Sequence, residues 1–277
     1  MTSRELLREA AGELDRAGCP SPEVDAEWLL AHVLGVSRTE LAADGKHPLR
    51  AEHEQRFRDL VSRRAGREPL PYVLGEWGFR RLTLKVDSRV LIPRPETETV
   101  VERSLALLAD VAQPRVLDIG VGSGAIALAI ADEHPGAQVV ATESSSEALA
   151  VARENLARTG LAERVDLAEG QLFAGLDGPF DLVVSNPPYI TAAELADLDP
   201  EVARFEPREA LVDHGATQGI AAGAFQVLRP GGSLVLETAD GKARDIATLL
   251  ESLGYEEVAI TDDLAGRERV VDGRAPR

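Results

Sequence analysis

The four residues Asn186-Pro187-Pro188-Tyr189 have the chemistry needed to hold a planar NH2 group. They follow residues 180–185, an apolar run that predicts a buried strand. The Asn186 side-chain oxygen and a proline carbonyl can accept the two N–H hydrogens of an adenine amine or a glutamine amide, and Tyr189 can pack on the planar group. Such a nitrogen has a delocalised lone pair, so it must be oriented before it can accept a methyl group. An ordinary Pro-Pro turn is the alternative interpretation.

A glycine-rich turn earlier in the chain favours the chemical interpretation. It follows an expected strand at residues 116–119 and consists of Gly120, Val121, Gly122, Ser123 and Gly124. Residues 125–131 are all small or aliphatic, which predicts a helix packed closely on a sheet. A second expected strand, at residues 138–142, leads into Glu143, where a ribose-binding acid belongs in a βαβ nucleotide site.

The spacing of these glycines indicates which nucleotide would bind. Gly120-x-Gly122-x-Gly124 is tighter than the dinucleotide pattern G-x-G-x-x-G, and Asp118 places a negative charge near the position of a pyrophosphate. Both features disfavour NAD. They favour a nucleoside that has no phosphates and carries a cationic group, which is S-adenosylmethionine.

With both motifs in view, the sequence resembles the release factor glutamine methyltransferase family, which methylates the glutamine amide of the Gly-Gly-Gln tripeptide in peptide chain release factors. The matching segments are Pro69-Leu70-x-Tyr72-x-x-Gly75, Phe79 and residues 90–98, 120–124, 185–190, 206–208, 210–211 and 263–267. They extend over nearly the whole chain. The resemblance implies a class I S-adenosylmethionine-dependent methyltransferase: a doubly wound α/β fold with a mostly parallel seven-stranded sheet and a small N-terminal helical bundle.

The resemblance also implies roles for individual residues. It assigns Gly120 to Gly124, Glu143 and Leu172 to cofactor binding, and Pro187, Pro188 and Tyr189 to the glutamine pocket. Asn186 would contact both cofactor and substrate. Two departures concern the cofactor: Glu143 replaces the more usual aspartate, and Gly170-Gln171-Leu172 replaces an acid followed by a large residue near the adenine. Residues 212–219 follow the family pattern only in part.

Three other functions use the same residues. A sister enzyme could methylate a glutamine of a ribosomal protein, and an adenine or cytosine amino-methyltransferase would use the same Asn-Pro-Pro-Tyr geometry. A cofactor-binding scaffold without activity is the third. The charge distribution opposes a nucleic-acid substrate: residues 1–85 carry 14 basic and 14 acidic residues, whereas the rest carries 16 basic and 33 acidic residues. An acidic catalytic part would repel DNA and attract a basic protein partner.

The composition predicts a cytoplasmic protein that needs no metal, and we expect it to be a monomer. We find no apolar stretch long enough to span a membrane, and the charged start is unlike a signal region. The single cysteine, Cys19, excludes an internal disulfide, and the five histidines lack metal-ligand spacing. Cys19 is expected to be inert.

The expected organisation is a helical substrate-recognition domain at residues 1–68, a β-hairpin linker at 69–92 and a catalytic domain at 93–277. Amphipathic stripes predict three short helices within residues 5–64. Arginines cluster at the end of this part, where they form either a solvated helix face or a contact for a partner or ribosomal RNA. The members are Arg56, Arg58, Arg63, Arg64 and Arg67. Residues 191–213 are expected to form a loop that closes over the site.

Overall fold

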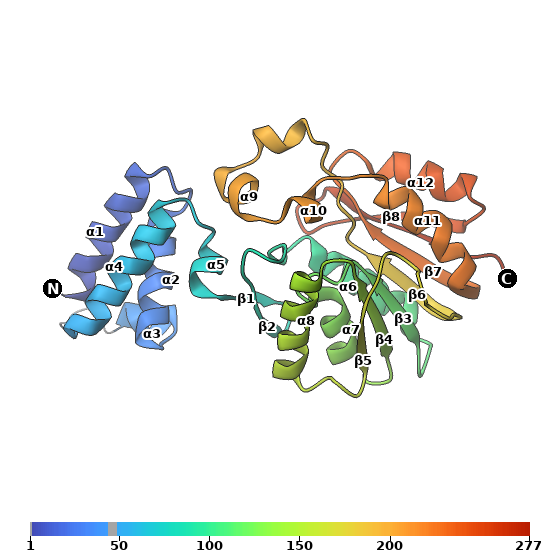
Figure 1. Ribbon diagram of the computed structural model, residues 1–277, viewed down its shortest axis with the longest axis horizontal. Helices are drawn as coiled ribbons and strands as arrows, with labels where there is room; N and C mark the ends of the chain where they lie inside the picture. The colour runs from blue at the N-terminus through green and yellow to red at the C-terminus, as the bar shows by residue number, and fades with distance from the viewer. Residues whose placement is uncertain (1, 44–48) are drawn as a thin grey trace. The chain divides into compact units, whose positions relative to one another are not determined.

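The computed structural model describes residues 2–43 and 49–277, which form two compact units (Figure 1). The first unit comprises the described residues up to Glu76 together with Asp199–Phe205. The second comprises Trp77–Leu198 and Glu206–Arg277. The short segment Asp199–Phe205 therefore packs with the N-terminal unit, although it follows the Asn-Pro-Pro-Tyr motif in sequence.

The first unit is helical, as the amphipathic stripes predict. Its helices are α1 (Ser3–Arg16), α2 (Pro22–Leu34), α3 (Arg38–Ala43), α4 (Ala51–Ala65), α5 (Leu70–Leu74) and α9 (Pro200–Phe205). Helix α1 begins with a capping box, in which Thr2 and Glu5 each bind the backbone N–H of the other. Its apolar stripe, Leu6, Ala10 and Leu14, is buried, so the core of this unit is formed by the residues that the helical period selects.

Buried charges also hold the first unit together. The Arg64 side chain is only 5% exposed; its Nε lies 2.8 Å from Asp25 Oδ2 and its Nη1 lies 2.9 Å from Glu201 Oε1. Arg67 binds the same Glu201 carboxylate through two nitrogens. These bonds attach helix α9 to helices α2 and α4. Arg64 is therefore neither part of a solvated face nor accessible to a partner.

The other clustered arginines are exposed or half-buried, and most are paired. Arg58 contacts Glu9 and Glu54, and Arg63 contacts Glu68. Cys19 is buried beside this network, and its Sγ lies 3.5 Å from the Arg64 carbonyl oxygen. Burial raises the pKa of the Cys19 thiol, which favours the protonated form over the nucleophilic thiolate.

The second unit contains the predicted seven-stranded sheet, in the order β5-β4-β3-β6-β7-β9-β8. The strands are β3 (Arg115–Ile119), β4 (Gln138–Glu143), β5 (Val165–Glu169), β6 (Phe180–Ser185), β7 (Leu228–Glu237), β8 (Glu256–Asp262) and β9 (Glu268–Arg274). The first five strands of this order (β5, β4, β3, β6 and β7) pair in parallel, and β9 is antiparallel to both β7 and β8. Successive strands are added on one side of β3 as far as β5 and on its other side from β6 onward, so the topological switch point lies between β3 and β6. Ligands bind at this point in doubly wound sheets.

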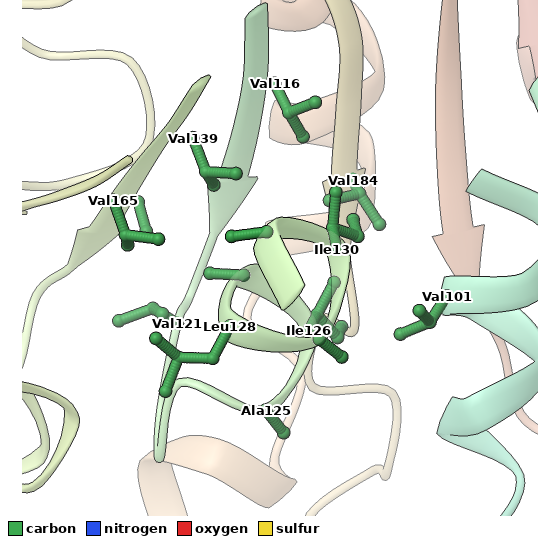
Figure 2. Packing of buried hydrophobic residues seen from close by; sticks show 14 of the residues in the cluster. Val101, Val116, Val121, Ala125, Ile126, Leu128, Ile130, Val139, Val165 and Val184 are labelled. Carbon is green, nitrogen blue, oxygen red and sulfur yellow. The ribbon is translucent and has the colours of Figure 1, made fainter. Parts of the chain in front are cut away.

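Helices cover both faces of the sheet (Figure 1). They are α6 (Thr97–Leu108), α7 (Ala125–Glu133), α8 (Ser146–Thr159), α11 (Ala216–Val227) and α12 (Ala243–Ser252). The short helix α10 (Arg208–Leu211) and the 3-10 helix η1 (Glu194–Asp197) belong to the segment between β6 and α11. Figure 2 shows one core, in which Ile126 and Ile130 of α7 lie among Val116, Val139 and Val184 of the strands. The alternate residues of the same strands form a second core with α11 and α12. Alternation of side chains along each strand therefore produces two apolar layers.

Three local features differ from the sequence expectation. The hairpin predicted within residues 69–92 is present as β1 (Glu76–Phe79) and β2 (Leu82–Lys85), but α5 precedes it. Strand β5 was not anticipated, although Val165-x-Leu167 alternates. The expected loop at residues 191–213 contains η1, α9 and α10, and an isolated bridge between Ile190 and Val212 joins its ends. Among the described helices, none is both long and apolar enough to span a lipid bilayer.

Candidate active site

The glycine-rich turn lies at the carboxyl end of β3, beside the end of β4. The backbone N–H groups of Gly120 and Val121 both donate to the Thr142 carbonyl oxygen, at 2.9 and 3.0 Å. Gly120 and Gly122 have φ values of +77° and +53°, and a Cβ at either position would meet nothing within 4 Å. The turn therefore exposes backbone to open space, as a loop that contacts a ligand must do. Beneath it, Asn155 Nδ2 donates to the Ser123 carbonyl oxygen at 2.8 Å.

Gly124 serves a different purpose from the other two glycines. Its φ is +92°, and a Cβ would lie 2.8 Å from Leu128 Cδ1 and 3.9 Å from the Ala152 Cα. The residue precedes the first residue of α7, so its left-handed conformation turns the chain from the loop into the helix. Glycine is needed here because of both the backbone angle and the nearby helix side chain.

Gly124→Ala should therefore weaken both the fold and the cofactor site. We expect a loss of about 1–2 kcal/mol of unfolding free energy, measured by urea denaturation, because an L-residue is strained in this conformation. We also expect weaker S-adenosylmethionine binding by calorimetry. Gly78→Ala is the control, since Gly78 has ordinary φ and open space around it. Equal behaviour of the two variants would contradict this account.

Asp118 is buried beneath the turn. Its Oδ2 accepts the Ala127 N–H at 3.0 Å, in the first turn of α7, and its Oδ1 has no hydrogen-bond partner among the described residues. Burial raises the pKa of Asp118 to about 7, and the neighbouring Glu143 charge also raises it. Asp118 therefore accepts a hydrogen bond from one of the N–H groups at the start of α7 to which a pyrophosphate would otherwise bind.

Glu143 lies at the end of β4, where its carboxylate faces the turn. Its Oε2 accepts the Gly122 N–H at 3.0 Å, and its Oε1 accepts the Ser145 N–H at 3.0 Å. A carboxylate in this place occupies a second N–H that a phosphate could bind. It also keeps lone pairs that can accept ribose hydroxyls.

The loop after β5 lies next to these residues. The Thr142 hydroxyl donates to the Leu172 carbonyl oxygen at 3.4 Å, which brings Leu172 to the end of β4. Leu172 has φ of +48°, and its side chain lies against Gly219 of α11 while remaining 36% exposed. An exposed apolar side chain beside the glycine-rich turn is suited to cover a flat ring.

Asn186 to Tyr189 follow β6 directly, at the same edge of the sheet. The Ser185 hydroxyl donates to the Ile119 carbonyl oxygen at 2.7 Å, so the ends of β6 and β3 are bound to each other. Asn186 Nδ2 donates to Thr97 Oγ1 at 3.2 Å. Pro187 is buried, whereas Pro188 and Tyr189 are half-buried. The motif is thus held directly beside the glycine-rich turn.

A buried acid, Glu237, lies at the end of β7 in the same area. The Tyr189 hydroxyl donates to its Oε1 at 3.5 Å, and its Oε2 has no partner among the residues that the structure describes. Burial raises the pKa of Glu237 to about 7, although hydrogen bonding by Thr97 and the charge of Arg269 oppose the rise. Burial together with the Glu237 charge raises the pKa of Tyr189 to about 12, so the phenol is neutral.

Sequence reasoning assigned no role to the side chains of Thr97 and Glu237. Thr97 lies in the segment 90–98, which is part of the family resemblance, and it is the first residue of α6. Glu237 ends the apolar run Leu234-Val235-Leu236, just as Asp118 follows Val116-Leu117. An acid at the end of a central parallel strand is the signal that could have identified it.

The segment after Tyr189 is anchored to the proline-rich segment. Arg94 Nη2 lies 2.5 Å from Glu206 Oε1, and the Glu206 side chain is almost completely buried. Burial raises the pKa of Glu206, and the adjacent Arg94 charge opposes the rise. Ile190 N donates to the Leu211 carbonyl oxygen at 3.0 Å. Residues 191–213 therefore start and end at fixed points next to the site.

Comparison with known proteins identifies the family. Residues 5–75 match the model of the PrmC N-terminal domain, and residues 101–202 match that of the methyltransferase small domain. The release factor glutamine methyltransferase of Deinococcus radiodurans is 46% identical over 280 residues, covering 99% of each chain. That of Geobacter sulfurreducens is 43% identical, covering 99% of this chain and 96% of the relative.

This chain belongs to the release factor glutamine methyltransferase family. The resemblance in its motifs is therefore confirmed, and the protein is a methyltransferase.

Solved structures agree on the fold. A methyltransferase from Pyrococcus furiosus aligns with a TM-score of 0.51 at 21% identity, covering 70% of this chain and 89% of its own. The catalytic domain of hMettl16, in complex with the MAT2A 3′UTR hairpin 1, aligns with a TM-score of 0.58 at 18% identity, covering 79% and 80%. These distant neighbours confirm the class I methyltransferase fold.

The Asn-Pro-Pro-Tyr motif and the glycine-rich turn follow β6 and β3, which are neighbouring parallel strands, so both lie at the same edge of the sheet. Glu143 and Leu172 flank the turn from β4 and from the loop after β5. Asn186 lies between the turn and Glu237, because β6 runs between β3 and β7. Their individual roles in binding stay predictions.

Proposed function

We propose that this protein methylates the side-chain amide nitrogen, N5, of the glutamine in the Gly-Gly-Gln motif of peptide chain release factors, using S-adenosylmethionine. The observation that carries the proposal is the bond between Ser185 and Ile119, which holds the glutamine-binding motif against the end of the cofactor turn. A methyl donor and a planar amide can then meet within one site. Membership of the family supports the choice of substrate.

The chemistry of the turn supports S-adenosylmethionine as the cofactor. Two N–H groups that would suit a pyrophosphate are occupied by Asp118 and Glu143, whereas open space remains above Gly120 and Gly122. Carboxylates favour a ligand with ribose hydroxyls and a positive charge over one with phosphates. We assign Gly120 to Gly124, Glu143 and Leu172 to this ligand. When bound, S-adenosylmethionine supplies an electrophilic methyl group on sulfur.

The residues of the protein act by positioning. Asn186 Oδ1 and a carbonyl oxygen of Pro187 or Pro188 accept the two amide N–H hydrogens, which orients the nitrogen for in-line attack. Tyr189, neutral because of its raised pKa, packs on the amide plane. As the bond from nitrogen to the methyl carbon forms, the carbon–sulfur bond breaks and its electron pair stays on sulfur, which leaves as a neutral thioether. The nitrogen loses its proton to water, so no strong general base is required. The Asn186 contact to the cofactor aligns the two reactants.

The two units have different proposed tasks. We assign the helical part, residues 1–68, to recognition of the release factor, the hairpin at 69–92 to linkage and residues 93–277 to catalysis. The match of residues 5–75 to the PrmC N-terminal domain supports the first assignment. Release factors act during translation, so we place the reaction in the cytoplasm, with the enzyme as a monomer. Contact with the ribosome is an extension of this proposal through the exposed Arg56.

Transfer of labelled methyl groups tests the proposed function. We expect label from S-adenosylmethionine on a purified release factor, and none on the same factor when the Gly-Gly-Gln glutamine is changed to alanine. Ribosomes and DNA are separate substrates in the same assay. Label on a ribosomal protein alone would reassign the substrate to the ribosome, and label on DNA alone would reassign it to a nucleic acid. Cofactor binding without any transfer would support a scaffold.

A further inference from the structure

The orientation of the Asn186 amide group decides whether the site can accept a glutamine. A side-chain amide has an oxygen that accepts hydrogen bonds and a nitrogen that donates them, on opposite sides of one plane. The NH2 group of a substrate glutamine needs acceptors. If the Asn186 amide were rotated by half a turn, it would present N–H groups to the substrate and repel it.

Thr97 contacts the nitrogen side of this amide. Asn186 Nδ2 donates to Thr97 Oγ1 at 3.2 Å, and no donor to Asn186 Oδ1 is found within residues 2–43 and 49–277. The oxygen is therefore available for a substrate. Thr97 is 4% exposed, so water does not readily replace its hydroxyl.

The position of Thr97 is itself well determined. It is the first residue of α6, and its N–H donates to the Arg94 carbonyl oxygen at 3.1 Å. Helix α6 packs on β6 and β7, the strands that carry Asn186 and Glu237 at their ends. A β-branched side chain in a helix has few allowed rotamers, so the hydroxyl is held in place.

Thr97 also acts on the buried acid Glu237. It lies close enough to this carboxylate to lower its pKa, and the Tyr189 hydroxyl donates to Glu237 Oε1 at 3.5 Å. A hydroxyl has one hydrogen to donate and lone pairs to accept. When its hydrogen is directed at Glu237, its lone pairs remain for the Asn186 N–H.

We propose that Thr97 is a positioning residue for methyl transfer, which fixes the Asn186 amide with its oxygen toward the substrate nitrogen, and that Glu237 fixes Thr97 in turn. This proposal rests on the proposed function. It explains why the site contains a buried carboxylate that never needs to act as a base. It also gives Thr97 a role beyond that of starting helix α6.

Thr97→Val and Thr97→Ser test the hydroxyl. Valine keeps the shape and removes the acceptor, so we expect kcat for release factor methylation to fall on the order of 10- to 100-fold, as for other small misplacements. Serine keeps the acceptor and should restore most of the activity. Thr99→Val is the matched control, because Thr99 is also a buried threonine of α6. Loss of kcat that serine does not restore, or an equal loss in Thr99→Val, would overturn the proposal.

A measurement without cofactor or substrate separates this proposal from the proposed function. The side-chain amide signal of Asn186 can be assigned by its loss in Asn186→Asp, and its hydrogen exchange followed by NMR. Exchange should be clearly faster in Thr97→Val than in wild type or Thr97→Ser. Unchanged exchange would overturn the positioning role even if methylation is observed. Absence of methylation by the wild type, with exchange as expected, would overturn only the function.

Glu237→Gln tests whether Glu237 fixes the Thr97 hydroxyl, and the measurement is the pH profile of kcat. Ionised Glu237 accepts from Thr97, whereas the protonated acid becomes a donor that competes for the Thr97 lone pairs. Activity should therefore fall as the pH drops below about 7, the pKa that burial produces. The charged or titratable groups facing this pair are Tyr189, Arg269, Glu96 and Arg94, with Glu206 bound to Arg94. An inflection that persists unchanged in Glu237→Gln would overturn the role of Glu237.

Discussion

Asn186→Ala should reduce kcat for release factor methylation by about 100- to 1000-fold, the range found when a well-placed polar group is removed from a transition state. Asn186 contributes the side-chain acceptor that orients the substrate nitrogen, and a proline carbonyl alone leaves the amide free to rotate. The side chain is half-buried at the end of β6 and forms one hydrogen bond, to Thr97. Its removal should therefore cost little folding stability.

The measurement is transfer of labelled methyl groups at saturating S-adenosylmethionine, since Asn186 is also expected to contact the cofactor. Thermal unfolding checks the fold, and calorimetry measures cofactor affinity separately. Gln218→Ala is the control, because it removes an exposed amide from α11. A kcat close to that of the wild type in Asn186→Ala would refute the proposed role.

Arg64→Leu should destabilise the helical unit by about 3–5 kcal/mol, because it leaves the buried Asp25 without its ion-pair partner and removes one of the two arginines bound to Glu201. The side chains of Arg64, Asp25 and Glu201 are 5%, 9% and 12% exposed, so water cannot solvate the remaining charges well. Part of the lost unfolding free energy should come from weaker packing of α9 on the unit, which Arg67 also holds through Glu201. Arg67 alone cannot compensate, since it does not contact Asp25.

Urea denaturation followed by the fluorescence of Trp28 measures this effect. Trp28 lies in α2 of the first unit, and a Trp77→Phe background removes the other tryptophan signal. Arg56→Leu is the control, because Arg56 is exposed on α4, the same helix as Arg64. If both leucine variants unfold at the same urea concentration, the buried ion pairs do not stabilise the unit as we infer.

Much of the active site could be predicted from short segments of sequence. Gly120 to Gly124 and Asn186 to Tyr189 each follow an apolar run, and strands that are buried on both faces have such continuous apolar sequences. Parallel strands place their carboxyl ends at one edge, so both motifs were expected at the same site. The two apolar layers of the sheet follow from the same local alternation.

Which arginines of the cluster are buried and which are exposed could not be predicted in this way. Arg56 and Arg64 lie on the same helix and are the same residue type, yet one is exposed and the other is buried. Buried Arg64 is paired with Asp25 and with Glu201, and Glu201 is more than a hundred residues away in sequence. A helical period locates the buried face of α4, but it does not reveal which distant carboxylate completes an ion pair there.

The sequence by itself determined the class of chemistry, because asparagine, prolines and tyrosine after a strand, with a glycine turn and an acid, have few other uses in combination. Only the tertiary structure decided how these groups are oriented. Thr97, Asn186 and Glu237 come from α6, β6 and β7, and they meet because these elements pack side by side. Hydrogen bonds depend on distances between atoms in space, and separation along the chain does not specify those distances.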